Sequence, residues 1–272
     1  MGIYNEFYGF HEQPFNIPPD PRFLFYSERH REAFNHLVFG VKERKGFIQV
    51  TGEVGAGKTT LCRAFLEHLG NEFTTALILN PCMTSNQLLR SVLLELGLEP
   101  SYNDRVRSYE TLNRFLLAEL DEGRDVVLII DEAQDLTPEL LEQVRLLSNL
   151  ETDQRKLLQI VLIGQPELRD LLDRKQLRQL RQRITVRYHL GPLSSPETED
   201  YIQHRLQVAG ANSRPTFNRW ALRKIHHSAG GIPRLINVLC DKTLLCGYVD
   251  GDAHLTTRHV RRALKELGGS LQ

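Results

Sequence analysis

A stretch of eight residues fits the P-loop pattern G-x-x-x-x-G-K-[ST], which binds the phosphates of a nucleotide. In order, its residues are Gly52, Glu53, Val54, Gly55, Ala56, Gly57, Lys58 and Thr59. Glycines let such a loop turn tightly and direct its N–H groups at phosphate oxygens. We expect Lys58 to reach the β- and γ-phosphates of ATP and Thr59 to offer its hydroxyl to Mg²⁺. The alternative is a glycine-rich turn that binds no ligand.

Two adjacent carboxylates, Asp131 and Glu132, follow the apolar run at residues 126–130. The carboxyl ends of parallel strands are where ligands of open α/β folds bind. There Asp131 would hold Mg²⁺ through its water shell, and Glu132 would orient and polarise an attacking water. The sequence therefore predicts a Mg²⁺-dependent ATPase. The alternative is that both residues merely begin a helix.

Gln165 follows another apolar run, at residues 159–163, and could help to position the same water. Alternatively, it only opens the next helix, with Pro166 at the first helical position.

Arg183 lies near the end of the most basic stretch, residues 169–187, just before the last apolar run. We predict that it reaches the γ-phosphate of a neighbouring subunit, with Arg181 as the second candidate. A solvated helix face is the usual explanation of such a charge run. Contact with DNA phosphates is a further alternative.

Arg234 follows Gly230-Gly231-Ile232-Pro233 and so falls in the first turn of a predicted helix. A positive charge is unfavourable there because of the helix dipole. We therefore predict that Arg234 approaches the nucleotide phosphates, and a structural salt bridge is the competing explanation.

The elements that would position these residues alternate between short apolar runs and helix-length segments. The predicted strands are residues 46–51, 75–79, 126–130, 159–163 and 185–190. This alternation predicts an α/β fold, a five-stranded parallel sheet with helices on both faces. Ser27 is expected to cap a helix that precedes the first strand.

The pattern changes after residue 190, which predicts two domains. Residues 1–190 would form the nucleotide-binding α/β domain, with an N-terminal strap at 1–26, and residues 191–272 a small helical lid. Ser195 is the predicted cap of the first lid helix, with Pro196 at its first position. Further lid helices are expected at 216–227, 233–246 and 257–267. The strap is rich in proline and aromatic residues, which either pack on the core or wall an adenine pocket.

The composition narrows the classes of function. Lysine plus arginine and aspartate plus glutamate both total 34, so the formal net charge is zero, which argues against a protein that mainly coats nucleic acid. The four cysteines lack the spacing of a zinc site, and we expect reduced core thiols. The sequence contains neither a signal peptide nor an apolar run long enough to cross a bilayer, so we expect a cytoplasmic location.

With these motifs in order, the chain resembles AAA+ ATPases, and more narrowly the ExeA or GspA family of type II secretion ATPases. The resemblance covers nearly the whole chain. It rests on the two nucleotide motifs and on residues 7–10, Pro14-Phe15, 19–23, Ala133-Gln134 and 164–168. It extends the phosphate-binding run to Thr60. It implies the sensor-1 position for Gln165, the arginine finger for Arg183 and sensor 2 for Arg234.

The resemblance also implies a ring-like homo-oligomer that powers assembly of a bacterial envelope machine, for type II secretion, a pilus or polysaccharide export. Longer members of the family carry a membrane helix and a peptidoglycan-binding domain after the ATPase. If this chain is complete, a partner at the cytoplasmic face of the inner membrane would carry out the membrane work; if it is an excised ATPase region, the missing part would hold the targeting. The alternative function is a DNA-binding regulator similar to the TniB transposition ATPases, supported by residues 169–187 and by the basic last helix.

Overall fold

The computed structural model describes residues 2–18, 20–101, 104–152, 155–211 and 214–269. Pro19, which belongs to the motif at residues 19–23, lies outside the described residues. So do residue 1 of the first predicted domain and residues 270–272 of the second. The chain forms two compact units. The sheet unit comprises residues 31–52 and 62–190, and the helical unit comprises residues 1–30, 53–61 and 191–272. The domain boundaries expected from the sequence stay predictions.

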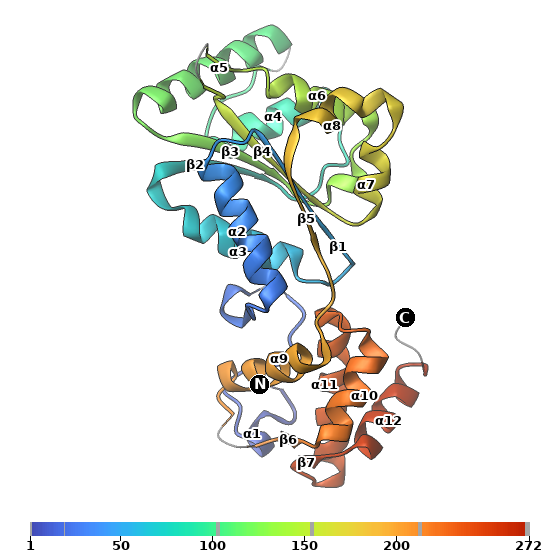
Figure 1. Cartoon of the computed structure of the whole chain (residues 1–272). Coiled ribbons are helices and arrows are strands. Elements are labelled where there is room, and N and C mark those ends of the chain that lie inside the picture. Colours follow the sequence, from blue (N-terminus) through green and yellow to red (C-terminus); the bar gives the residue numbers. More distant parts are fainter. Residues whose placement is uncertain (1, 19, 102–103, 153–154, 212–213, 270–272) are drawn as a thin grey trace. The chain divides into compact units, whose positions relative to one another are not determined.

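The sheet unit is built on five parallel strands in the order β2-β3-β4-β1-β5 (Figure 1). The strands are β1 (Phe47–Gly52), β2 (Phe73–Ile78), β3 (Asp125–Ile130), β4 (Leu158–Gly164) and β5 (Ile184–Leu190). Each lies within two residues of its predicted bounds. All of β4 and all but the first residue of β3 are buried, as expected of central strands covered on both faces. The predicted sheet is thus confirmed.

Helices cover both faces of this sheet (Figure 1). On one face lie α2 (Glu28–Lys42) and α3 (Lys58–Leu69), which contact each other through the rings of Phe34 and Phe65. On the other face lie α4 (Ser85–Glu95), α5 (Arg105–Asp121), α6 (Pro138–Leu147), α7 (Glu167–Leu172) and α8 (Arg178–Arg183). Their leucines and valines form one hydrophobic core with side chains of β2, β3 and β4. Three short 3-10 helices connect these elements: η2 (Gly70–Glu72), η3 (Ala133–Asp135) and η4 (Lys175–Leu177).

The helical unit contains the C-terminal helices that the sequence predicts. They are α9 (Ser195–Val208), α10 (Arg219–Ala229), α11 (Pro233–Asp250) and α12 (Thr257–Glu266). Two strands of two residues each, β6 (Thr216–Phe217) and β7 (His254–Leu255), pair in parallel. Near the N-terminus this unit also includes α1 (Asn5–Tyr8) and η1 (Pro21–Phe23).

Two predicted helix starts in this unit are wrong. The cap of α9 is Ser194, whose hydroxyl accepts from the Glu197 N–H in a capping box, and Ser195 is the first helical residue. The helix expected from residue 216 begins at Arg219, because Thr216 and Phe217 pair with β7 and Asn218 caps α10. The predicted cap of α2 is confirmed, since the Ser27 hydroxyl accepts from the His30 N–H at 3.2 Å.

The N-terminal segment packs into the core of the helical unit. Its buried aromatic residues join side chains of α9 and α11 in one cluster; they are Tyr4, Tyr8, Phe10, Phe15 and Phe23. These aromatic residues of the strap thus pack on a hydrophobic core, which was the first of the two alternatives. The second alternative, that the strap forms a wall of an adenine pocket, stays a prediction.

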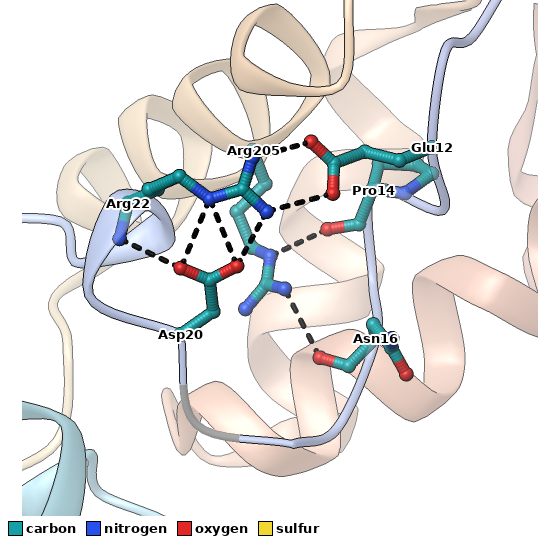
Figure 2. Close-up of polar contacts among 6 residues, drawn as sticks. All are labelled: Glu12, Pro14, Asn16, Asp20, Arg22 and Arg205. Carbon is teal, nitrogen blue, oxygen red and sulfur yellow. Dashed lines mark hydrogen bonds and ion pairs between the residues drawn. The ribbon is translucent and has the colours of Figure 1, made fainter.

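Arg205 of α9 fastens the strap (Figure 2). The buried guanidinium donates to the carbonyl oxygens of Pro14, at 2.6 Å, and Asn16, at 3.0 Å, and lies over the Phe23 ring. Beside it, Arg22 forms a two-pronged ion pair with Glu12 and also binds Asp20. The strap at Pro14 and Asn16 is irregular, so its carbonyl oxygens have no partners within a helix or sheet. The charged Arg205 side chain supplies their hydrogen bonds instead.

The four cysteines differ in burial. Cys62, Cys240 and Cys246 are buried, but Cys82 is exposed, so the expectation of a core thiol is wrong for Cys82. Burial raises the pKa of the Cys62 thiol to about 12, which leaves it neutral. Among the described helices, none is both long and apolar enough to cross a membrane.

Candidate functional site

The P-loop follows β1 directly, and its carbonyl oxygens are held by donors. Glu53 O accepts from the Ala56 N–H at 3.1 Å and from the Lys58 ammonium at 3.0 Å. Gly55 O accepts from the Arg234 N–H at 3.2 Å, and Ala56 O lies 3.1 Å from Nε2 of His30. Because the oxygens of Glu53, Gly55 and Ala56 point toward these donors, N–H groups of the loop other than that of Ala56 can face the opposite side. Such a concave row of N–H groups is a binding site for an anion.

Gly55 and Gly57 are required by the shape of this loop. Their φ angles are +80° and +98°, which L side chains rarely adopt. A Cβ at Gly55 would also lie 2.5 Å from Cβ of Arg234, and one at Gly57 would lie 3.1 Å from Nε2 of His30. A larger residue would therefore be strained at both positions.

The predicted residues that follow the loop begin a helix. Lys58, Thr59 and Thr60 form the first turn of α3, and Gly52 is the last residue of β1. The amino end of a helix carries a partial positive charge that favours phosphate. The arrangement of strand, loop and helix is the one that the P-loop pattern requires.

Arg234 lies against the loop within the helical unit. It is the second residue of α11, and its side-chain carbons approach the Gly55 Cα because Gly55 has no side chain. Among the described residues, Arg234 forms no ion pair, so the structural salt bridge that competed with a role at the phosphates is not observed there.

In the sheet unit, a small network joins two of the predicted residues. Glu132 Oε2 accepts from the side-chain amides of Gln134, at 2.9 Å, and Gln165, at 3.3 Å. Gln134 in turn accepts from the Gln165 N–H at 2.9 Å. The ends of β3 and β4 are adjacent, so the carboxylate and both amides meet at the carboxyl edge of the sheet. Gln165 is thus close to Glu132, as the shared role of positioning water requires.

The backbone at Asp131 and Glu132 is unusual. Asp131 is buried, donates its N–H to Ile78 O at the end of β2 and accepts from the Glu132 N–H with its side chain. Glu132 has φ +51° and ψ +40°, a left-handed conformation that costs about 1 kcal/mol or more in a residue with a side chain. Such local strain is typical of residues held for a function.

The two candidate arginine fingers differ in their partners. Arg183 ends α8 and binds Ser148 Oγ at 2.9 Å and Asn149 Oδ1 at 2.6 Å, both neutral acceptors just after α6. Arg181 is paired with the carboxylate of Asp173 at 3.0 Å. Within the described part of the chain, no carboxylate forms an ion pair with Arg183, so its charge is the more available of the two.

Two contributors, His30 and Gln134, were missed from the sequence. His30 lies three residues before Ala33 and so extends the apolar stripe of α2, and a polar residue on the buried face of a helix was the available signal. Gln134 follows the acidic pair, but its partner Gln165 is distant in sequence, so nothing local indicates the contact.

The oxygen donors suit magnesium. A buried carboxylate, Asp131, and a hydroxyl, Thr59, are hard ligands of the kind that Mg²⁺ prefers. In the described residues there is no group of three or more His, Cys, Asp or Glu that could hold a metal by itself. Mg²⁺ typically takes one or two protein ligands and completes its shell with water and substrate phosphates.

Comparisons with known proteins identify a domain family and a relative that this chain resembles. Residues 41–172 match the family model described as an AAA domain. General secretion pathway protein A of Aeromonas hydrophila is 46% identical over 268 residues, which cover 98% of this chain and 49% of that protein. The chain thus spans about half the length of this relative.

Solved structures show the same fold. The ORC2 protein of Aeropyrum pernix, solved as ADPNP-ADP complexes, has a TM-score of 0.68 and 18% identity, over 97% of this chain and 74% of that one. Drosophila ORC bound to DNA has a TM-score of 0.71 and 20% identity, over 94% and 65%. At such low identity the likeness shows the fold alone. With its P-loop, its five-stranded parallel sheet and the AAA match at residues 41–172, the chain contains an AAA domain and is similar, over nearly its whole length, to about half of General secretion pathway protein A.

Proposed function

We propose that this protein binds ATP with Mg²⁺ and hydrolyses it, and that hydrolysis drives assembly of a bacterial envelope machine. The observation that carries the proposal is the P-loop, whose Glu53, Gly55 and Ala56 oxygens are all bonded to donors. The Glu132–Gln134–Gln165 network supports the hydrolytic part.

The loop residues 52–60 would cradle the phosphates through their N–H groups, and Lys58 would exchange its bond to Glu53 O for the β- and γ-phosphates. Thr59 and Asp131 would hold Mg²⁺. When bound, the ion neutralises charge on the phosphates. Arg234, beside Gly55, would add a positive charge from the helical unit.

Glu132 would accept a hydrogen bond from the attacking water, and the amides of Gln134 and Gln165 would fix the carboxylate that does so. The water oxygen forms a bond to the γ-phosphorus, the bond to the β–γ bridging oxygen breaks, and the water proton passes to Glu132. ADP and inorganic phosphate leave.

We further propose a ring-like homo-oligomer in which Arg183 reaches the γ-phosphate bound by the next subunit. The partner would be a secretion or pilus assembly component at the cytoplasmic face of the inner membrane. The support is the 46% identity to a general secretion pathway protein. The same relative favours envelope assembly over the DNA-binding alternative.

Two variants test the ATPase function. Lys58→Ala should weaken ATP binding, because it removes the ammonium that bonds the phosphates, whereas Glu132→Gln should retain binding and lose turnover by about 100-fold or more. Binding is measured by titration with ATP and Mg²⁺, and turnover by phosphate release. Full hydrolysis by the Glu132 variant would refute the role given to that carboxylate.

A further inference from the structure

His30 is a buried titratable residue that the proposed chemistry does not use. Its exposed fraction is 4%, and it occupies the first turn of α2. Its Nδ1 lies 2.8 Å from Ser27 Oγ, and its Nε2 lies 3.1 Å from the carbonyl oxygen of Ala56 in the P-loop. Both ring nitrogens therefore have partners, and one of those partners is the phosphate-binding loop itself.

The partners of the ring define its protonation. A carbonyl oxygen can only accept, so Nε2 carries the proton and donates to Ala56. Burial lowers the pKa of His30, although the Ala56 carbonyl and the Glu197 carboxylate oppose this, and the ring is therefore neutral near pH 7. Nδ1 of a neutral ring protonated at Nε2 must accept, and its donor is the hydroxyl hydrogen of Ser27.

Ser27 has a second bond that fixes this arrangement. Its hydroxyl oxygen accepts from the His30 N–H at 3.2 Å as the cap of α2. The hydroxyl hydrogen is then directed at Nδ1. The cap of a helix, one imidazole tautomer and one P-loop carbonyl thus form a continuous chain of hydrogen bonds.

The bond to Ala56 O fixes the direction of the next N–H group. In a trans peptide the C=O of one residue and the N–H of the following residue point in opposite directions. Holding the Ala56 oxygen on His30 therefore turns the Gly57 N–H away from His30. The approach is close, since even a Cβ on Gly57 would lie 3.1 Å from Nε2.

We propose that His30 is a positioning residue of the nucleotide site, which orients the Ala56–Gly57 peptide so that the Gly57 N–H faces the phosphates. The inference rests on the proposed ATP binding. Without the Nε2–H donor, the Ala56 oxygen would lose its buried partner, and the peptide could rotate and withdraw a phosphate donor.

The test compares His30→Leu, which removes the donor, with His30→Gln, whose amide can place an N–H near the position of Nε2. A matched control is His226→Leu, because His226 is a half-buried histidine of the same unit whose Nδ1 binds Thr198 Oγ1 and not the P-loop. For each variant the measurements are the dissociation constant of ATP, the melting temperature without nucleotide, and hydrogen exchange at residues 53–58.

We expect His30→Leu to bind ATP about tenfold more weakly, the effect of losing one hydrogen bond, and to exchange P-loop amides faster. His30→Gln should stay within about twofold of the wild type. His226→Leu should lower the melting temperature without changing the affinity. Wild-type affinity in His30→Leu, or equal losses of affinity in His30→Leu and His226→Leu, would overturn the proposal.

Two measurements, the nitrogen chemical shifts of the His30 ring and the hydrogen exchange of the P-loop amides, can be made on the wild-type protein without nucleotide. Nitrogen chemical shifts of the wild-type imidazole should show a neutral ring protonated at Nε2, and a ring protonated at Nδ1 would contradict the bond to Ala56. If the wild-type protein failed to bind ATP, the proposed function would fall. The shifts and the P-loop exchange would then still decide whether His30 holds the loop.

Discussion

Gln134 shows how one side chain can serve two others. Its amide nitrogen donates to Glu132, and its amide oxygen accepts from the Gln165 backbone, so it fixes the carboxylate relative to the end of β4. An added Cβ at Gly164 would lie 2.8 Å from that oxygen, which indicates how closely Gln134 fits between the strands.

Replacing Gln134 by Leu should therefore lower kcat by about 10- to 100-fold while leaving the ATP dissociation constant nearly unchanged. The reason is that the carboxylate loses its alignment with the attacking water, whereas the phosphate contacts remain. Steady-state phosphate release and ATP titration separate the two effects. Gln207→Leu, an exposed glutamine of α9, is the control. A variant with unchanged kcat would show that the network does not align Glu132.

The neutral state of His30 also predicts how stability depends on pH. Its folded pKa is lowered, so below the unfolded pKa of about 6.5 the unfolded chain binds a proton that the folded chain does not. The free energy of unfolding should thus fall as the pH drops below this value and level off once the folded pKa is passed. Urea unfolding of wild type and His30→Gln between pH 7.5 and 5 measures this. A difference between them that does not vary with pH would contradict the lowered pKa.

At the scale of elements, the sheet could be predicted because its central strands β3 and β4 are short, buried runs rich in Val, Ile and Leu, a pattern that is visible without distant information. The helix caps were harder. Ser194 and Ser195 are adjacent and chemically identical, and the choice between them depends on a reciprocal bond, in which Glu197 accepts from the Ser194 N–H. The same limit applies to Thr216, whose strand pairing with His254 comes from another part of the chain.

The two serines give a test of that cap. Ser194→Ala should destabilise the protein by about 1 kcal/mol, because the Glu197 N–H loses its acceptor, and Ser195→Ala should have an effect of less than about 0.5 kcal/mol. Chemical denaturation of both variants gives the comparison. Equal effects would mean that the hydroxyl of Ser194 does not cap α9.

At the scale of the whole molecule, the proposed site needs a second copy of the chain. The arrangement of Arg183 on neutral acceptors leaves its charge for a phosphate, whereas Arg181 is already paired with Asp173. Sequence position alone could only rank these two arginines, because their partners come from the segments just after α6 and just after α7.

We expect the specific ATPase activity of the wild type to rise with protein concentration across the range in which it assembles. Arg183→Ala should abolish this rise, with a loss of about 1,000-fold in kcat if Arg183 acts as an arginine finger, whereas Arg181→Ala should retain it. Activity at a series of concentrations, with light scattering to follow assembly, provides the measurement. A wild type whose specific activity is constant through that range would exclude a shared site.

The position of β1 inside the sheet has a consequence for the newborn chain. The strand that leads into the P-loop pairs with β4 and β5, so that Phe47 lies beside Ile160 and Ile184. A ribosome delivers these partners only after the whole of β2 and β3 has emerged. Until then an apolar strand has unpaired edges, which is the condition in which chains aggregate or recruit chaperones. The phosphate loop is translated early, but the strands β4 and β5, which pair with the strand before it, are translated much later.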